Sequence, residues 1–260
     1  MTEGEFLPAG GGAEVPEIPP RPRRWWVAGL TLLLVGALLA TFIPGLLPRE
    51  GTGSGTGFAL AEGGYVLTAA HVVRGAAEIS VYWEGRGYAA SIIALSTDQD
   101  VALLVSDTLP PVPVVLLAGM QPEFGDPVTA VGHPGGAPRP TALSTSVAGI
   151  GWWAVGPEGA VLRGLIATRD SFRRGYSGAP LVNDRGQVVG VVTGSMTAAS
   201  GEQFGFAVSI HRVVDWLSDR GIGLPTGSGD LLPPMEESEI VARLTPSVFR
   251  VEARFPPGAR

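Results

Sequence analysis

The sequence of 260 residues contains no cysteine and no lysine, and it has only three histidines. The lack of cysteine excludes disulfides, thiol nucleophiles and thiolate metal sites. The lack of lysine excludes Schiff-base catalysis, the Gly-Lys pair of a P-loop and a Ser–Lys dyad. Three histidines without cysteine rarely make a zinc site, so we expect no metal and no cofactor. The net charge of −6 argues against nucleic acid as a partner.

Glycine and proline are abundant, at 38 and 23 residues, about twice their average share. This composition favours turns and short strands. Short apolar runs broken by Gly, Pro and Asp follow one another along most of the chain. They are Phe58–Leu60, Tyr65–Thr68, Ile79–Trp83, Ala89–Leu95, Val101–Val105, Val114–Leu117, Pro127–Gly132, Val161–Ala167, Leu181–Val182, Val188–Thr193 and Phe204–Val208. Their lengths and spacing predict an all-β domain, a sandwich or a barrel.

One helix is predicted after these runs, where four apolar residues recur at helical spacing and Gly221 follows as a stop. The four are Ile210, Val213, Val214 and Leu217. The stretch before the first run, Gly51–Gly57, has the sequence GTGSGTG and predicts a flexible approach rather than a dinucleotide-binding turn. We place the domain at 51–225 and a C-terminal extension at 226–260.

A long apolar segment near the N-terminus predicts a membrane anchor. No charged residue lies between Trp25 and Pro48. Trp25–Ile43 alone would span about 28 Å as a helix, close to the roughly 30 Å of a bilayer core. Arginines at positions 21, 23 and 24 precede the segment, so the positive-inside rule places the N-terminus in the cytoplasm. We expect a disordered cytoplasmic tail at 1–24, a transmembrane helix at 25–47 and the domain outside the cytoplasm.

The alternatives for this segment are a cleaved signal peptide and a buried core helix. A signal peptide has a shorter apolar core and a small-residue cleavage site, whereas here a 24-residue tail precedes the core. A helix that is apolar all round lies either in a large core or in a membrane. We keep an uncleaved, single-pass anchor in the cell membrane as the prediction.

The segment Gly175–Pro180 (GYSGAP) has the features of a nucleophile turn. A nucleophilic serine needs a backbone that turns its own N–H and a nearby N–H toward one developing oxyanion. Glycines two residues before and one residue after Ser177 permit that turn. The esterase elbow G-x-S-x-G would require glycine at the position of Ala179. Alone the pattern is weak, and a Ser–Gly turn between two strands explains it more simply.

Ser177 would need a histidine as general base, and the chain offers three. His71 lies in the run TAAHVV at the end of a predicted strand, His133 lies in the turn VGHPGG, and His211 begins the predicted helix. The base also needs an orienting carboxylate. Asp100 directly precedes the apolar run VALL, where a strand start would fix it. Each residue taken singly is as well explained by a structural or solvated position.

The three segments together are far more specific. TAAHVV, DQDVALL and GYSGAPLVN follow in the order His, Asp, Ser, with separations of 29 and 77 residues. This arrangement resembles a trypsin-like serine protease domain, closest to the bacterial HtrA (Deg) group. GTGFAL and GGYVLTAAHVV are similar to that group's GSGF and GYILTNNHVV. VGHPGG is similar to IGNPFG, and GFAVSI to GFAIP, so the similarity covers about residues 51–220.

The resemblance implies two antiparallel six-stranded β-barrels with a closing C-terminal helix and a catalytic triad between the barrels. Ser177 would be the nucleophile, His71 the general base and then acid, and Asp100 the group that orients His71. The N–H groups of Gly175 and Ser177 would form the oxyanion hole of an acyl-transfer reaction. The partners would be protein or peptide substrates, and members of the group are often trimers, so a homo-oligomer is compatible with it.

The motif departs from the family pattern GNSGGP at Tyr176 and Ala179, and the family's TDAAINP reads TRDSFRR here. We expect the two arginines that end this run to be solvated, with attraction of acidic substrates as the alternative. Four residues would border the primary specificity pocket by position. They are Ser171, Thr193, Gly194 and Ser195. The resemblance implies small aliphatic substrate residues, and the absence of an acid at Ser171 argues against an Arg or Lys pocket.

The C-terminal extension is too short for the PDZ domain that HtrA proteins usually carry. Residues 238–244 predict a short helix, and the alternation that follows predicts a half-buried strand. Its apolar face holds Phe249, Val251, Ala253 and Phe255. TPSVFRV resembles the SPSVVRI that precedes GSGF in the family, and nothing similar stands before Gly51. The strand therefore either supplies the missing first strand of barrel one, by circular permutation or subunit swap, or is an incomplete second protease domain.

We predict a membrane-anchored serine endopeptidase that faces outside the cytoplasm. The main alternative is a pseudoprotease that binds peptides without turnover. A membrane adaptor whose triad pattern is accidental is the least favoured interpretation. Covalent modification of Ser177 would separate the first from the others, and peptide binding would separate the second from the third.

Overall fold

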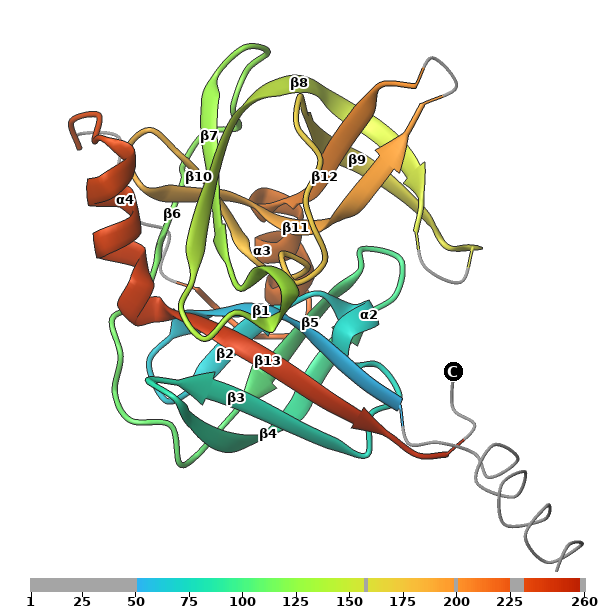
Figure 1. Ribbon diagram of the computed structural model, residues 1–260, viewed down its shortest axis with the longest axis vertical. Coiled ribbons are helices and arrows are strands. Elements are labelled where there is room, and N and C mark those ends of the chain that lie inside the picture. The colour runs from blue at the N-terminus through green and yellow to red at the C-terminus, as the bar shows by residue number, and fades with distance from the viewer. Residues whose placement is uncertain (1–50, 157–158, 199–200, 225–231, 258–260) are drawn as a thin grey trace, which may run out of the picture. The chain divides into compact units, whose positions relative to one another are not determined.

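The computed structural model describes residues 51–156, 159–198, 201–224 and 232–257. The predicted tail and anchor, 1–24 and 25–47, lie outside the described residues. Among those that are described, no helix has the length and apolarity needed to cross a bilayer. Strands dominate, and they form two closed β-structures with three short α-helices beside them (Figure 1).

The first structure is a barrel of six strands in the order β1-β13-β3-β4-β5-β2. Its strands are β1 (Gly51–Ala61), β2 (Tyr65–Thr68), β3 (Glu78–Trp83), β4 (Arg86–Ser96), β5 (Val101–Val105) and β13 (Val248–Phe255). All neighbouring pairs are antiparallel. The short helix α2 (Ala70–Val73) follows β2 after one residue. This barrel matches the six-stranded barrel that the sequence predicts.

Strand β13, from the C-terminal extension, closes this barrel between β1 and β3 (Figure 1). Its register pairs Phe255 with Gly51 and Val248 with Phe58. The four apolar residues predicted to share a face are all buried, whereas Arg254 on the other face is exposed. Helix α4 (Glu237–Leu244) and the 3-10 turn η4 (Thr245–Ser247) lead into the strand. The extension thus completes barrel one within the same chain and does not start a separate domain.

Strand β1 corrects one expectation. Residues 51–57 are not a flexible approach but the first part of β1; all of them pair with β13, and Gly57 also pairs with β2. Gly55, Thr56 and Gly57 are buried. A Cβ on Gly55 would lie 2.8 Å from the carbonyl oxygen of Ser177. The glycines therefore permit a close backbone approach. The same abundance of glycine is what makes the segment similar to a flexible linker in sequence.

The second structure is a sheet in the order β10-β7-β8-β9-β12-β11-β6, closed by a further pairing of β10 with β11. Its strands are β6 (Leu116–Leu117), β7 (Pro127–Gly132), β8 (Thr141–Val155), β9 (Val161–Thr168), β10 (Pro180–Asn183), β11 (Gln187–Thr197) and β12 (Gln203–Ser209). The 3-10 turn η1 (Pro134–Gly136) follows β7. Six of these strands, β10, β7, β8, β9, β12 and β11, close a ring in which every pairing is antiparallel. Six strands were predicted for this barrel; β6 is added to the ring as a seventh strand and pairs parallel to β11. The predicted helix, α3 (Ile210–Ser218), packs on β11 and β12. It is not the last element of the domain, because α4 and β13 follow it.

One buried apolar cluster joins the two β-structures. It includes Phe58 and Leu103 from the first and Val131, Leu165 and Phe206 from the second, each at 2% exposure or less. Full burial of an apolar side chain of this size contributes about 1.5–3 kcal/mol. This shared core holds the two structures against each other and so fixes the groups that meet between them.

Candidate active site

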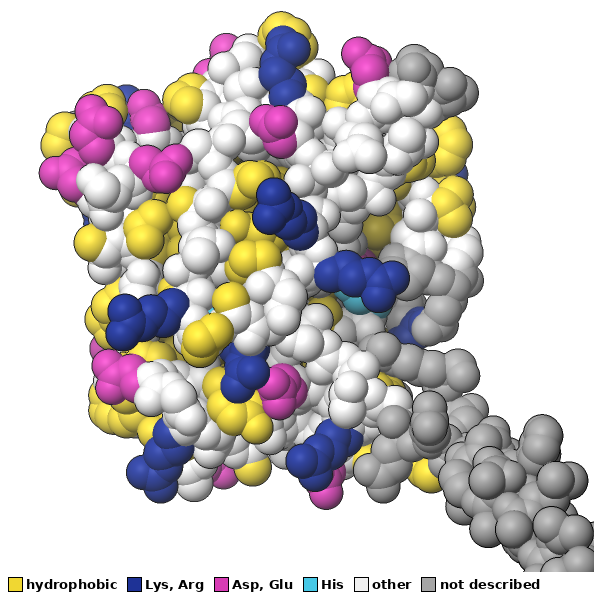
Figure 2. All heavy atoms as spheres, in the orientation of Figure 1, with side chains coloured by type: hydrophobic (Ala, Val, Ile, Leu, Met, Phe, Trp, Pro, Cys, Tyr) yellow, Lys and Arg dark blue, Asp and Glu magenta, His cyan; other side chains and the backbone are white. Residues whose placement is uncertain are grey.

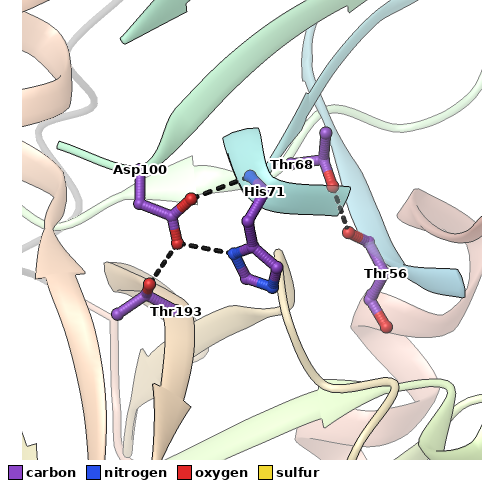
Figure 3. A network of polar contacts seen from close by, with 5 residues as sticks. All are labelled: Thr56, Thr68, His71, Asp100 and Thr193. Atoms are coloured by element: carbon purple, nitrogen blue, oxygen red, sulfur yellow. Dashed lines mark hydrogen bonds and ion pairs between the residues drawn. The ribbon is translucent and has the colours of Figure 1, made fainter. Parts of the chain in front are cut away.

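His71 and Asp100 come from the first barrel and are in direct contact (Figure 3). His71 lies on α2, just after β2 ends, and Asp100 directly precedes β5. Because β2 and β5 are antiparallel neighbours, residues 29 positions apart meet. Nδ1 of His71 is 2.7 Å from Oδ2 of Asp100, and the His71 backbone N–H donates to Oδ1 at 2.9 Å.

This contact determines which ring nitrogen of His71 is free. An ionised carboxylate only accepts hydrogen bonds, so Nδ1 carries the proton and Nε2 is left to accept one. Asp100 adopts a φ of 53°, in the left-handed region that non-glycine residues rarely occupy. Its carbonyl accepts the Ala70 N–H at 3.1 Å, and its own N–H donates to the Thr97 carbonyl at 3.3 Å. These bonds hold the strained turn that presents the carboxylate.

A third hydrogen bond reaches Asp100 from the second β-structure. Thr193 on β11 is buried, and its hydroxyl donates to Oδ2 of Asp100 (Figure 3). Asp100 is only 4% exposed, so the three bonds it accepts offset the cost of burying its charge. Thr193 was predicted to bind substrate. Its hydroxyl is bonded to Asp100, and the residue also lines the cavity that Gly194 and Ser195 border.

Ser177 lies in the loop between β9 and β10, and Thr56 of the first barrel holds this loop. The Thr56 N–H donates to the Ser177 carbonyl at 2.8 Å, and its Oγ1 donates to the Gly175 carbonyl at 2.6 Å. The same Oγ1 accepts the His133 N–H at 2.9 Å. Thr68 Oγ1 donates to the Thr56 carbonyl at 2.7 Å and fixes the clamp in turn (Figure 3).

Thr56 is a residue of the site that the sequence did not indicate. Its partner Gly175 is 119 residues away, and no local pattern encodes such a contact. The one available signal was its place between two glycines in a strand, because glycine in a strand often marks a close approach of another backbone.

The oxyanion turn depends on two glycines with positive φ. Gly175 has a φ of 99° and Gly178 a φ of 85°. A Cβ on Gly175 would lie 2.3 Å from the His133 carbonyl oxygen, and one on Gly178 2.1 Å from the Thr56 carbonyl oxygen. Neither site tolerates a side chain without a backbone shift.

Two N–H groups in this turn are available to a ligand. The Gly135 N–H donates to the Arg174 carbonyl at 2.8 Å. The Arg174 carbonyl and the Gly175 N–H belong to the same trans peptide, in which the two groups point in opposite directions. The Gly175 N–H therefore points away from Gly135. Within the described part of the chain, neither the Gly175 nor the Ser177 N–H donates to a protein acceptor. Such a pair of free donors can stabilise a developing oxyanion.

The Ser177 turn lies beside the helix that carries His71. A Cβ on Gly178 would be 2.8 Å from the Ala69 nitrogen, and one on Gly55 would touch both the Ser177 carbonyl and the Val72 side chain. No hydrogen bond between the described residues joins the Ser177 hydroxyl to the His71 ring. In unliganded enzymes this bond is often long and tightens only with substrate.

The other two histidines lie elsewhere. His133 is buried behind the serine loop, with Nδ1 2.7 Å from the Ala137 carbonyl oxygen. Burial lowers the pKa of His133, and the nearby positive charge of Arg250 lowers it further, although carbonyl groups of Ala137 and Val248 act in the opposite direction. His211 lies on α3. In the described ranges, no group of three or more His, Asp or Glu side chains is placed to hold a metal ion.

Three of the four predicted pocket residues line one cavity of about 300 Å³: Thr193, Gly194 and Ser195. Ser171 does not line it, and a Cβ on Gly194 would meet nothing within 4 Å. Ser195 Oγ accepts the Phe172 N–H at 2.6 Å and donates to the Phe172 carbonyl at 3.1 Å. The Ser171 hydroxyl donates to Gln203 Oε1 at 3.0 Å. Ser195 therefore ties β11 to the segment that precedes the serine turn. The adjacent arginines 173 and 174 are exposed.

Comparison with known proteins gives one consistent result. The model of the trypsin-like peptidase domain matches residues 55–191. The serine protease Rv3671c of Mycobacterium tuberculosis is 32% identical over 178 residues, which are 67% of this chain and 44% of that protein. The periplasmic pH-dependent serine endoprotease DegQ of Escherichia coli is 35% identical over 164 residues, which are 62% of this chain and 35% of that protein.

A solved structure agrees with these relatives. The crystal structure of the Rv3671c protease from M. tuberculosis in its active form covers 88% of this chain and 100% of its own, with a TM-score of 0.57 and 25% identity. The chain spans less than half the length of the two curated relatives.

Proposed function

Since the chain belongs to the trypsin-like peptidase family, we propose that it is a serine endopeptidase of the HtrA type that cleaves proteins or peptides. One observation carries the proposal. Asp100 binds both the ring and the backbone N–H of His71, and beside this pair a fixed turn leaves the N–H groups of Gly175 and Ser177 unpaired. This arrangement suits acyl transfer from a substrate to a serine and then to water.

The reaction uses these groups in sequence. His71 Nε2 takes the proton of Ser177 Oγ as Oγ attacks the scissile carbonyl carbon, and the oxyanion that forms accepts hydrogen bonds from Gly175 and Ser177. Asp100 stabilises the imidazolium through Nδ1. His71 then gives the proton to the leaving amine, which leaves an acyl group on Ser177 Oγ. Water, deprotonated by His71, releases the acid and restores the serine hydroxyl.

The geometry around Ser195 supports a preference for small, uncharged residues before the scissile bond. The hydroxyl of Ser195 is held on the backbone of Phe172, so the space between these two walls is narrow. Gly205, on β12, lies against the Phe172 ring, since a Cβ there would be 2.5 Å from it. Ser171 offers a hydroxyl rather than an acid, so an arginine or lysine would find no counter-charge there.

We also propose that residues 25–47 anchor the protein in the cell membrane, with the protease domain outside the cytoplasm. The uncharged run and the arginines before it support this topology. The test is a pair of fusions of alkaline phosphatase, which folds only outside the cytoplasm, at residue 20 and after residue 260. Activity of the second fusion alone is expected, and activity of the first alone would contradict the topology.

The catalytic proposal is tested by reacting the full chain, in detergent, with a fluorophosphonate probe. The wild type should label, Ser177→Ala should not, and His71→Ala should label at least about 10³-fold more slowly. A folded wild type that binds peptides but neither labels nor cleaves them would contradict the proposal and favour a pseudoprotease.

A further inference from the structure

A cavity of about 680 Å³ lies away from His71, Asp100 and Ser177, none of which lines it. Three segments form it: the β3–β4 turn, the stretch from η1 to β8, and η4 with the start of β13. The last of these belongs to the C-terminal extension. The volume falls in the range of about 300–1,000 Å³ typical of ligand sites, so the cavity has room for a short peptide.

The cavity combines fixed positive charge with apolar walls. Arg250 places its guanidinium 4.2 Å from the centre of the Tyr82 ring and 2.7 Å from Glu252, with its side chain 24% exposed. Arg139, at the rim, is exposed and makes no ion pair with any described residue. The other walls are largely prolines and the ring of Trp83. Figure 2 shows basic side chains, with some acidic ones among them, along the face where β13 runs, and a group of acidic ones over α4.

This chemistry matches a carboxylate on an apolar peptide. An arginine stacked on an aromatic ring is pre-organised, and its guanidinium can bind a carboxylate through two parallel hydrogen bonds. Aromatic and proline walls suit an extended peptide rather than a compact inorganic anion. Two arginines and one glutamate, Glu84, line the cavity, and Glu252 already pairs with Arg250. The charge that attracts an anionic ligand therefore comes first from Arg139, which has no ion pair with a described residue, and Arg250 adds the donors that Glu252 leaves free.

The wall that closes the cavity also holds the serine turn. His133 lines the cavity, and its N–H donates to Thr56 Oγ1, which donates to the Gly175 carbonyl. In the same turn, the Gly135 N–H donates to the Arg174 carbonyl at 2.8 Å. Arg250 reaches this turn through the Gly136 carbonyl at 3.5 Å. A ligand that binds Arg250 therefore acts on the segment that orients the Gly175 N–H.

We propose that this cavity is an effector site for the carboxylate of an apolar peptide. The bound peptide stabilises the segment 133–137, keeps the Gly175 N–H in the oxyanion site and thereby speeds the reaction of Ser177. This second step rests on the proposed function, whereas binding itself does not. A ligand shifts the equilibrium between two arrangements of the segment 133–137 only if it binds one of them more tightly. The hydrogen bonds that join this segment to the cavity wall and to the serine turn supply that preference.

Binding is tested with the full-length Ser177→Ala chain, which cannot turn a peptide over. The probes are an acetylated Pro-Phe-Pro-Leu with a free carboxylate and the same peptide as a C-terminal amide, titrated by calorimetry. The acid should bind at least tenfold more tightly than the amide. Arg250→Gln should remove that difference, and Arg139→Gln, at an exposed position that folding does not need, should reduce it.

The matched control is Arg254→Gln. Arg254 lies on the same strand and pairs with the exposed Glu78 at 3.3 Å, but it does not line the cavity, so this variant should keep the tenfold preference. Equal binding of acid and amide, or an unchanged preference in Arg250→Gln, would overturn the site. Inorganic phosphate that binds as tightly as the acid would show a general anion site and overturn the peptide assignment.

Coupling is tested on the chain with Ser177 intact, by the rate of fluorophosphonate labelling with and without the acid peptide. A rise of at least threefold that saturates with binding, and that Arg250→Gln abolishes, is expected. Binding without any change of rate would overturn the effector role. No labelling under either condition would instead contradict the proposed function, and the calorimetric result would still decide the site.

Discussion

Replacement of Thr56 by valine should damage both stability and reactivity, although Thr56 touches no reacting atom. The residue is fully buried, and valine reproduces its shape without the hydroxyl. The change leaves the Gly175 carbonyl and the His133 N–H without the partner that each has now. An unsatisfied buried group costs about 1–3 kcal/mol, so the free energy of unfolding should fall by about 2–6 kcal/mol.

The reactivity of Ser177 should fall as well, because the freed Gly175 carbonyl no longer fixes the turn. Loss of a whole oxyanion donor costs about 10²–10³ in rate. A displaced donor should cost less, so labelling of Thr56→Val by the fluorophosphonate should be about 10–100-fold slower.

Thr56→Ser is the matched control, because it keeps the hydroxyl and loses one methyl group, which is worth about 1 kcal/mol. Urea unfolding and labelling rates of the two variants, measured side by side in folded protein, separate the hydrogen bonds from the packing. If Thr56→Val were as stable as Thr56→Ser and reacted at the wild-type rate, the clamp between the barrels would be refuted.

Three further predictions follow from the same structure. Thr193→Val, which removes a donor to buried Asp100, should lower kcat about tenfold with little change in KM, whereas Thr193→Ser should restore it; equal activity of both would contradict the role. Burial lowers the pKa of His133 below 6.5, so the unfolded chain binds this proton at a higher pH than the folded one. The stability that neutral His133 contributes is therefore full above pH 6.5 and is lost as pH falls through the folded pKa. His133→Gln should flatten this part of the plot of unfolding free energy against pH, and an unchanged slope would contradict the prediction. Deletion of 237–260 should abolish cooperative unfolding, and the milder Phe249→Ala should cost about 3–5 kcal/mol; unchanged thermal stability of the deletion would exclude a structural role for β13.

Much of the barrel architecture was predictable, because alternation and spacing are local signals. The buried face of β13 and the helix at Ile210–Ser218 follow from period alone. Strand β8, the longest of the described strands at 15 residues, was missed. Only Val147 and Ala154 are buried along it, and its pairing with β9 has three register shifts. Without one buried face, the sequence carries no period-two pattern there.

The site divides in the same way. His71, Asp100 and Ser177 stand in motifs long enough to be identified, and the structure brings His71 and Asp100 together. Thr56 and the bond from Thr193 to Asp100 join residues 119 and 93 positions from their partners. Those contacts exist only once both barrels are closed and packed, so nothing in the local sequence specifies them.

The placement of β13 explains how a strand can move to the far end of a chain without harm to the site. Its register sets Phe255 beside Gly51, so the end of β13 meets the start of β1 as the two arms of a hairpin would. A short turn between these two ends would give the strand order in which β13 precedes β1. The ladder is the same in either order, because hydrogen bonds depend on which strands are adjacent and not on which is made first. The order of this chain also shapes the cavity wall, since α4 and η4 lead into β13 and Thr245 and Pro246 line the same cavity as His133.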